Sequence, residues 1–144
     1  MASTIALART DAEIAACYPV MAQLRPHIAA DAFVPRVRRQ MGQGYELAVL
    51  SADGRPAAVA GFRVLEFLFS GMTLYVDDLV TDSTNRSKGY GKDLLSWLKQ
   101  EAVGRGCVSL QLDSGVQRYD AHRFYLTQRM RISSHHFALD LPDK

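Results

Sequence analysis

The stretch that decides the fold of this 144-residue chain is Arg86-Ser87-Lys88-Gly89-Tyr90-Gly91-Lys92. It follows an apolar run over residues 74–81, which is typical of a buried strand, and it precedes a segment with leucines at helical spacing. A strand, a loop with two glycines and then a helix can bind a phosphate group. The glycines let the main chain approach the ligand, and the first N–H groups of the helix donate to it. The sequence therefore predicts a phosphate-binding loop at residues 86–92.

Within that loop, the main-chain N–H groups of Ser87 to Lys92 are expected to face the phosphate. The side chains of Arg86, Lys88 and Lys92 are expected to add positive charge nearby. For Lys88 and Lys92 taken singly, a solvated position on the surface is an equally good interpretation.

Two common phosphate loops are excluded by their spelling. A Walker A loop needs Gly-x-x-x-x-Gly-Lys-Ser/Thr, but Asp93 follows Lys92 and Arg86 stands where the first glycine belongs. A dinucleotide fingerprint needs a third glycine, and Leu94 occupies that position. The sequence therefore favours neither an ATPase nor a nicotinamide-dependent enzyme.

The spelling that fits is Arg/Gln-x-x-Gly-x-Gly/Ala after a strand, which resembles motif A of the GNAT superfamily of acyl-CoA-dependent N-acetyltransferases. A second stretch, Ala121-His122-Arg123-Phe124-Tyr125, is similar to a later motif of that family. Arg118 stands where the family usually has Asn, and Arg129-Met130 replaces Gly-Phe. The resemblance covers roughly residues 57 to 140.

The resemblance implies that acetyl-CoA is the co-substrate. It implies that the main chain of Leu79, Val80 and Thr81 binds the pantetheine arm as an added strand would, and that the loop holds the pyrophosphate. Tyr125 would then bind the coenzyme's sulfur and donate a proton to the leaving thiolate. Many relatives dimerise, so a homodimer is a further expectation.

For the fold, the sequence predicts one α/β domain over residues 1–144, with a mixed, mostly antiparallel sheet and helices on both faces. The resemblance adds a splay between the fourth and fifth strands. Asp53-Gly54 indicates a hairpin turn, and Thr10 with Glu13 spells a capping box. The expected strands are 4–9, 45–51, 57–69, 72–81, 108–113 and 132–140, and the expected helices are 10–25, 31–41, 87–103 and 116–128.

The composition bears on which partners and which cellular location to expect. The formal charge is +2, with acidic and basic residues interspersed, which argues against a nucleic-acid-binding surface. Cys17 and Cys107 lie in apolar patterns and are expected to be buried free thiols in a reducing compartment. No secretion signal and no membrane-spanning run are visible, so the expected location is the cytoplasm.

An amine acceptor needs a base, since an alkylammonium has an unperturbed pKa of about 10.4 and only about one molecule in a thousand is neutral at pH 7. We rank Asp113 first as the base, Asp77 second and Glu66 third. Because adjacent strand residues point to opposite faces, only one of Asp77 and Asp78 is expected to face the site. Each carboxylate could instead cap a helix or pair with an arginine.

The histidines do not assemble a metal site. His135 and His136 are adjacent in the expected last strand and so diverge. His122 lies one helical turn before Tyr125, and His27 lies in the connection that often lines the acceptor pocket in the resembled family.

The sequence thus predicts an N-acyltransferase that moves an acetyl group from acetyl-CoA to a primary amine by direct attack, without a metal. The alternative is a non-catalytic module that binds acyl-CoA, and transfer of a longer acyl group is a third interpretation. The acceptor, a small molecule or a peptide, has no signature, although a set of basic residues would favour an anionic one: Arg25, Arg36, Arg38 and Arg39.

Overall fold

The computed structural model describes residues 3–143. These residues form two compact units, which divide between Leu112 and Asp113. The first unit contains the whole sheet and four of the α-helices, and the second contains the last helix.

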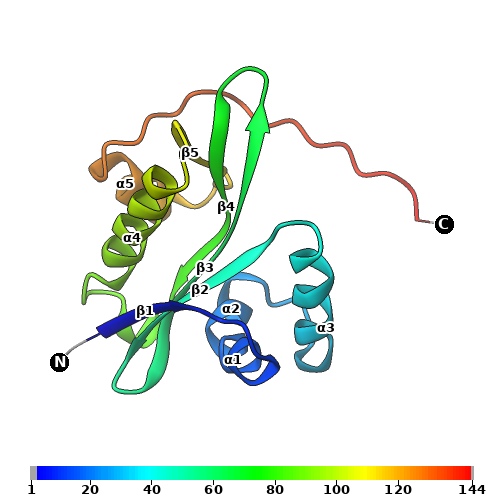
Figure 1. Cartoon of the computed structure of the whole chain (residues 1–144), viewed down its shortest axis with the longest axis vertical. Helices are drawn as coiled ribbons and strands as arrows, with labels where there is room; N and C mark the ends of the chain where they lie inside the picture. Colours follow the sequence, from blue (N-terminus) through cyan, green and yellow to red (C-terminus); the bar gives the residue numbers. More distant parts are fainter. Residues whose placement is uncertain (1–2, 144) are drawn as a thin grey trace. The chain divides into compact units, whose positions relative to one another are not determined.

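The first unit is built on a five-stranded sheet of order β1-β2-β3-β4-β5 (Figure 1). β1 to β4 pair antiparallel along the chain, and β5 pairs parallel with β4. The predicted mixed, mostly antiparallel sheet is therefore confirmed. The strands are β1 (Ser3–Leu7), β2 (Glu46–Ala52), β3 (Arg55–Phe67), β4 (Gly71–Thr81) and β5 (Ser109–Leu112).

The turn between β2 and β3 is the predicted Asp-Gly hairpin. Asp53 and Gly54 have φ angles of 56° and 75°, and Ala52 pairs with Arg55 across the turn. Two consecutive residues with positive φ match the right-handed twist of the flanking strands. This turn fixes the register of β2 against β3.

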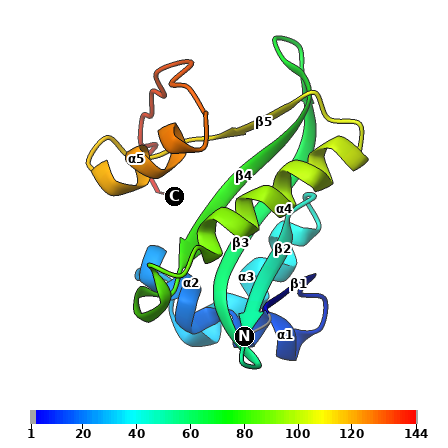
Figure 2. The same cartoon turned by 90° about the vertical axis from the view of Figure 1, so that its left-hand side faces the viewer.

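Helices cover both faces of the sheet, as predicted (Figures 1 and 2). α1, α2 and α3 lie on one face, and α4 lies on the other. α4 buries Leu94, Leu95 and Leu98, and its Trp97 packs edge-on against Phe62 of β3 at a ring separation of 6.1 Å. These helices are α1 (Asp11–Ala16), α2 (Tyr18–Leu24), α3 (Ala30–Met41) and α4 (Tyr90–Gly104).

The expectation of a single helix over residues 10–25 is wrong, because the chain breaks it at Cys17 into α1 and α2. Pro19 causes the break: it lacks the N–H that a continuous helix would use, and its ring would clash with the carbonyl four residues earlier. The start of α1 agrees with the prediction, since the Thr10 hydroxyl accepts from Glu13 N at 3.1 Å and the Glu13 carboxylate accepts from Thr10 N at 2.9 Å.

The second unit contains α5 (Tyr119–Thr127) followed by an extended chain. The expected strand at 132–140 is wrong, because no strand among residues 3–143 pairs with this segment. Its apolar side chains stay in solvent, with Ile132 and Phe137 76% and 92% exposed. An alternating pattern makes a strand only when a neighbouring strand takes up its hydrogen bonds.

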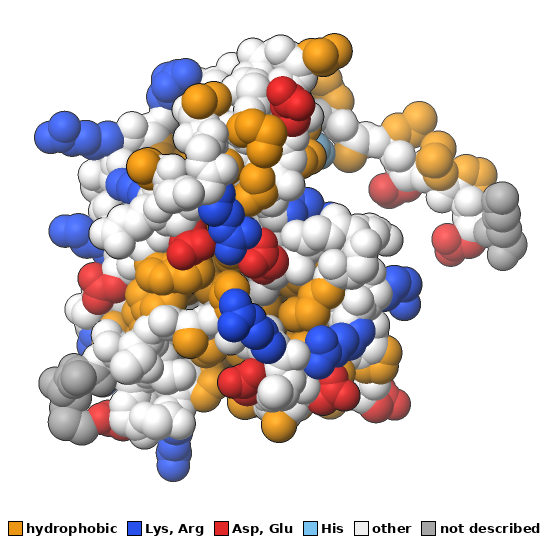
Figure 3. All heavy atoms as spheres, viewed as in Figure 1, with side chains coloured by type: hydrophobic (Ala, Val, Ile, Leu, Met, Phe, Trp, Pro, Cys, Tyr) orange, Lys and Arg blue, Asp and Glu red, His pale blue; other side chains and the backbone are white. Residues whose placement is uncertain are grey.

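Acidic and basic side chains are mixed over the face shown in Figure 3. Within residues 3–143, no helix has the length and apolar character needed to cross a membrane.

Candidate active site

The predicted phosphate loop joins β4 to α4. A short 3-10 turn (Ser83–Asn85) is followed by exposed residues, and α4 begins at Tyr90 with Gly89 as its cap. Gly89 has a φ of 80°, and a Cβ added there would meet nothing within 4 Å. The backbone conformation, not lack of space, is therefore what favours glycine at this position.

The loop presents both kinds of donor that a phosphate needs. The N–H groups of Tyr90, Gly91 and Lys92 belong to the first turn of α4, where no intrahelical acceptor exists. The side chains of Arg86, Lys88 and Lys92 are exposed around them. This arrangement agrees with the predicted loop and can bind an anion through the helix N-terminus.

A side-chain clamp fixes the start of the loop to α2. The Gln23 amide donates to the Asp82 carboxylate at 2.9 Å and accepts from the Ser83 N–H at 2.9 Å. The hydrogen bond from Gln23, together with one from Thr84, lowers the pKa of Asp82. α2 therefore positions the residues that lead into the loop.

β4 extends beyond its pairing with β5. The paired register runs from Thr73 with Ser109 to Val76 with Leu112, whereas β4 continues to Thr81. The outer edge of residues 77–81 thus has no β5 partner, which agrees with the expected splay. Leu79, Val80 and Thr81, predicted to bind the pantetheine arm, lie on this segment.

A β-bulge shapes the same segment. Gly61 of β3 pairs with Asp78, and the next residue, Phe62, pairs with Val76, so Asp77 is the extra residue of the bulge. A bulge interrupts the strict alternation of side chains between the two faces. Asp77 and Asp78 therefore both line one cavity, whereas strict alternation would have placed their side chains on opposite faces.

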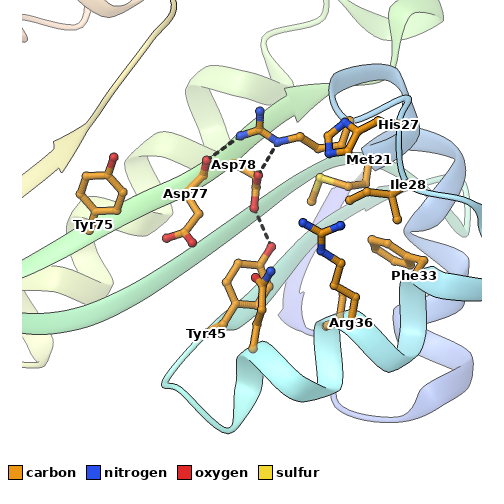
Figure 4. Close-up of a pocket in the computed structure, with 12 residues that line it drawn as sticks. Met21, His27, Ile28, Phe33, Arg36, Tyr45, Tyr75, Asp77 and Asp78 are labelled. Atoms are coloured by element: carbon orange, nitrogen blue, oxygen red, sulfur yellow. Dashed lines mark hydrogen bonds and ion pairs between the residues drawn. The ribbon is translucent and has the colours of Figure 1, made fainter. Parts of the chain in front are cut away.

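That cavity has a volume of about 400 Å³ and lies between β4 and the α2–α3 region of the first unit (Figure 4). Its helix side combines apolar residues with polar and charged ones, and its strand side carries two carboxylates. The lining residues are Met21, Arg25, His27, Ile28, Phe33, Arg36, Val37, Gln40, Tyr45, Tyr75, Asp77 and Asp78.

Asp78 is held by two donors from outside β4. The Tyr45 hydroxyl donates to Oδ2 at 2.8 Å, and Arg25 Nε donates to Oδ1 at 2.9 Å. Arg25 also donates through Nη2 to the main-chain carbonyl of Asp77 at 3.0 Å. Burial raises the pKa of Tyr45 well above its ordinary value, and the Asp78 charge raises it further.

Asp77 is held by Arg63 of β3, which donates to both carboxylate oxygens, with Nε 3.1 Å from Oδ1. The same guanidinium lies 5.5 Å from the centre of the Tyr45 ring. The hydrogen bonds to Asp77 raise the pKa of Arg63. Sequence reasoning did not identify Tyr45 or Arg63 as residues that hold the two aspartates. The signal available for Arg63 was its charge within the apolar run of β3.

The opposite wall of the cavity carries Arg36 of α3 (Figure 4). Its guanidinium has no ion-pair or hydrogen-bond partner among residues 3–143. His27 also lines the cavity, as expected from its place between α2 and α3. Glu66, ranked third as a base, is exposed near the β3–β4 turn and is not part of the lining.

The remaining predicted residues belong to the second unit. Tyr125 lies half-buried on α5, where burial raises its pKa and Arg118 opposes that shift. Asp113 comes directly after β5 in the sequence and is 3.4 Å from His136 Nδ1. His122 Nε2 is 2.8 Å from the Gly115 carbonyl oxygen, a contact that suits a structural role.

Both cysteines are free thiols, and Cys17 is buried as predicted, whereas Cys107 is only half-buried, which corrects the prediction for that residue. Within the part of the chain that the structure describes, no three His, Cys, Asp or Glu side chains come together as metal ligands.

Comparison with known proteins points to one family. A profile of the acetyltransferase (GNAT) family matches residues 10–129. The chain is 36% identical over 114 residues to an uncharacterized N-acetyltransferase, YhdJ, of Bacillus subtilis, a match that covers 78% of this chain and 80% of that protein. It is 34% identical over 62 residues to an aminoalkylphosphonate N-acetyltransferase of Salmonella typhimurium, covering 43% of this chain and 40% of that protein.

Among solved structures, the fold is similar to that of the aminoglycoside N-acetyltransferase AAC(6')-Iy in complex with CoA. The TM-score is 0.84 with 12% sequence identity, and the match covers 98% of this chain and 97% of that one. At this level of identity the likeness shows that the two chains share a fold.

Proposed function

Because the chain belongs to the GNAT family of acetyltransferases, we propose that it transfers an acetyl group from acetyl-CoA to a primary amine. The observation that carries the proposal is the combination, in one unit, of a β4 edge that extends beyond its β5 partner and the exposed N-terminus of α4 shortly after it. Both curated relatives are named N-acetyltransferases, and one name specifies an aminoalkylphosphonate, which supports transfer to nitrogen.

The coenzyme would lie along the strand and the loop. The pyrophosphate would accept hydrogen bonds from the N–H groups of Gly89 to Lys92 and would be neutralised by Arg86 and Lys88. The pantetheine arm would pair with the main chain of residues 79–81, as an added strand does. One main-chain N–H of this edge would then polarise the thioester carbonyl.

The amine would enter from the cavity next to that edge. Asp77 and Asp78 precede residue 79 directly on β4 and line the cavity, so an ammonium bound by these carboxylates lies close to the acyl group. Each carboxylate oxygen has lone pairs left after its arginine or tyrosine contact, and these can accept from the ammonium.

The reaction would be a direct attack. The neutral amine nitrogen forms a bond to the thioester carbon, the carbon–sulfur bond breaks, and the coenzyme leaves as a thiolate. A carboxylate, Asp113 or Asp77, would first take one proton from the bound ammonium. The second proton, which the nitrogen loses on attack, would replace the one that the leaving thiolate receives. Tyr125 is the proposed proton donor to the thiolate, and its raised pKa keeps its phenol protonated at neutral pH.

The test is calorimetric binding of acetyl-CoA together with thiol release in the presence of an amine panel. Gly89→Glu should abolish binding, because it places a negative charge and a strained backbone in the phosphate loop. Gly104→Glu, at the far end of the same helix, is the matched control and should bind normally. Wild-type protein that is folded but does not bind the coenzyme would overturn the proposal.

A further inference from the structure

We propose that the acceptor is a small amine that also carries an anionic group, a carboxylate or a phosphonate, and that Arg36 binds this group. The inference rests on the proposed function and specifies its acceptor. It is carried by the distribution of charge around the 400 Å³ cavity of the first unit.

The acidic wall of the cavity is already compensated within the protein. Asp77 is paired with Arg63, and Asp78 is paired with Arg25 and hydrogen-bonded to Tyr45. The charge of each carboxylate is therefore balanced by an arginine. The acidic wall gives no reason to expect a second cationic group on the acceptor besides the reacting amine.

The opposite wall is not compensated. Arg36 points into the cavity from α3 (Figure 4), and no acidic side chain among residues 3–143 pairs with it. Its neighbours on α3 in the lining, Phe33 and Val37, are buried apolar residues. A guanidinium beside an apolar wall is a strong and directional partner for a carboxylate or phosphonate, which it can bind through two N–H groups.

The other basic residues of this helix differ from Arg36. Arg38 forms an ion pair with Asp11 at 2.8 Å and donates to the carbonyl of Arg9. Arg39 is exposed, as Arg36 is, but it is not part of the cavity lining. The unpaired positive charge within the cavity is therefore specific to position 36 among the arginines of α3.

The two walls also fix the orientation of the ligand. The amine must lie at β4, because residues 77 and 78 adjoin the strand edge proposed to hold the acyl arm. The rest of the acceptor then extends toward α3, where the Arg36 guanidinium can bind an anion. A cavity of this size holds a small molecule with both groups.

The test compares acceptors of matched chain length, each with a primary amine at one end, over a short series of lengths. The other end is a phosphonate, a carboxylate, a methyl group or a second amine. Thiol release should give kcat/KM values at least about tenfold higher for an anionic end than for a methyl or amine end, as expected for one charged hydrogen-bonded contact. The phosphonate and carboxylate arms tell the two anions apart.

Variants of α3 locate the effect. Arg36→Gln should raise KM for the anionic acceptors about 10- to 100-fold and leave the methyl-ended amine unchanged. Arg36→Glu should reverse the preference in favour of the diamine. Arg39→Gln is the matched control and should behave as wild type. Equal use of all four ends, or an Arg36→Gln variant with unchanged KM values, would overturn the inference.

A second measurement, ligand binding, tests the inference independently of acetyl transfer. If no amine releases thiol, direct calorimetry of the phosphonate- and carboxylate-ended amines decides the matter. Binding that Arg36→Gln abolishes keeps the assigned ligand class, and the absence of such binding overturns it.

Discussion

The Tyr45 hydroxyl donates a 2.8 Å hydrogen bond to the carboxylate of Asp78, and it reaches that carboxylate across the face of Gly61. A Cβ at position 61 would lie 1.8 Å from the Tyr45 hydroxyl oxygen. Residue 61 pairs with Asp78 across β3 and β4, so the missing side chain creates the space in which the phenol lies. One glycine thus permits a contact that holds the acidic wall of the cavity.

Gly61→Ala is therefore expected to displace the Tyr45 ring and break its bond to Asp78. Overpacking of a buried site costs about 1–3 kcal/mol, so the midpoint of urea unfolding should fall. Gly104→Ala is the control, because a Cβ there meets nothing within 4 Å, and it should be neutral or slightly stabilising. Equal stability of the two variants would contradict the packing described for Tyr45.

Tyr45→Phe removes the same hydrogen bond without disturbing the packing. Because the acceptor is a carboxylate, the loss should cost about 1.5–3 kcal/mol of unfolding free energy. Tyr18→Phe is a matched comparison, since Tyr18 donates to the uncharged carbonyl of Ile28 at 2.6 Å and should cost about 0.5–1.5 kcal/mol. In an Asp78→Asn background, Tyr45→Phe should lower the unfolding free energy by a smaller amount. An unchanged loss would show that the hydrogen bond to Asp78 does not cause the destabilisation.

The glycine turn that opens α4 could be predicted from sequence because its determinants are local. Gly89 adopts the left-handed conformation that only glycine accepts readily, and the helix after it has a clear apolar period. The Asp53-Gly54 hairpin was predicted for the same reason. Backbone conformations of this kind depend on residues that are adjacent in the sequence, so the sequence predicts them directly.

The cavity could not be predicted in the same way. Its acidic wall depends on a bulge at Asp77 and on donors that are distant in sequence, Arg25 and Tyr45. Alternation along a strand predicts opposite faces for adjacent residues, and only the pairing of β4 with β3 reveals the extra residue. Pairings at long range are set by the folded sheet and leave no local pattern.

Tyr125→Phe is expected to lower kcat about 10- to 100-fold with little change in the KM for the amine, if its phenol protonates or hydrogen-bonds the leaving thiolate. Because burial raises the pKa of Tyr125, the wild-type protein should keep this proton at neutral pH and lose it only at a higher pH than an exposed tyrosine does. Tyr119→Phe, an exposed change on the same helix, is the control and should leave kcat unchanged. Equal kcat values for the two variants would remove Tyr125 from the reaction.

The buried thiol of Cys17 predicts how stability depends on alkaline pH. Burial raises the pKa of Cys17 from 9.0 to about 12, so the folded chain keeps a proton that the unfolded chain has lost. The contribution of Cys17 to the free energy of unfolding is complete below about pH 9. Above that pH it falls by about 1.4 kcal/mol per pH unit, until about pH 12. Urea unfolding between pH 8 and pH 10.5 should show this slope in wild type and in Cys107→Ala. Cys17→Ala should be less stable at neutral pH but should have a shallower slope, and a slope equal to that of wild type would show that Cys17 does not titrate as described.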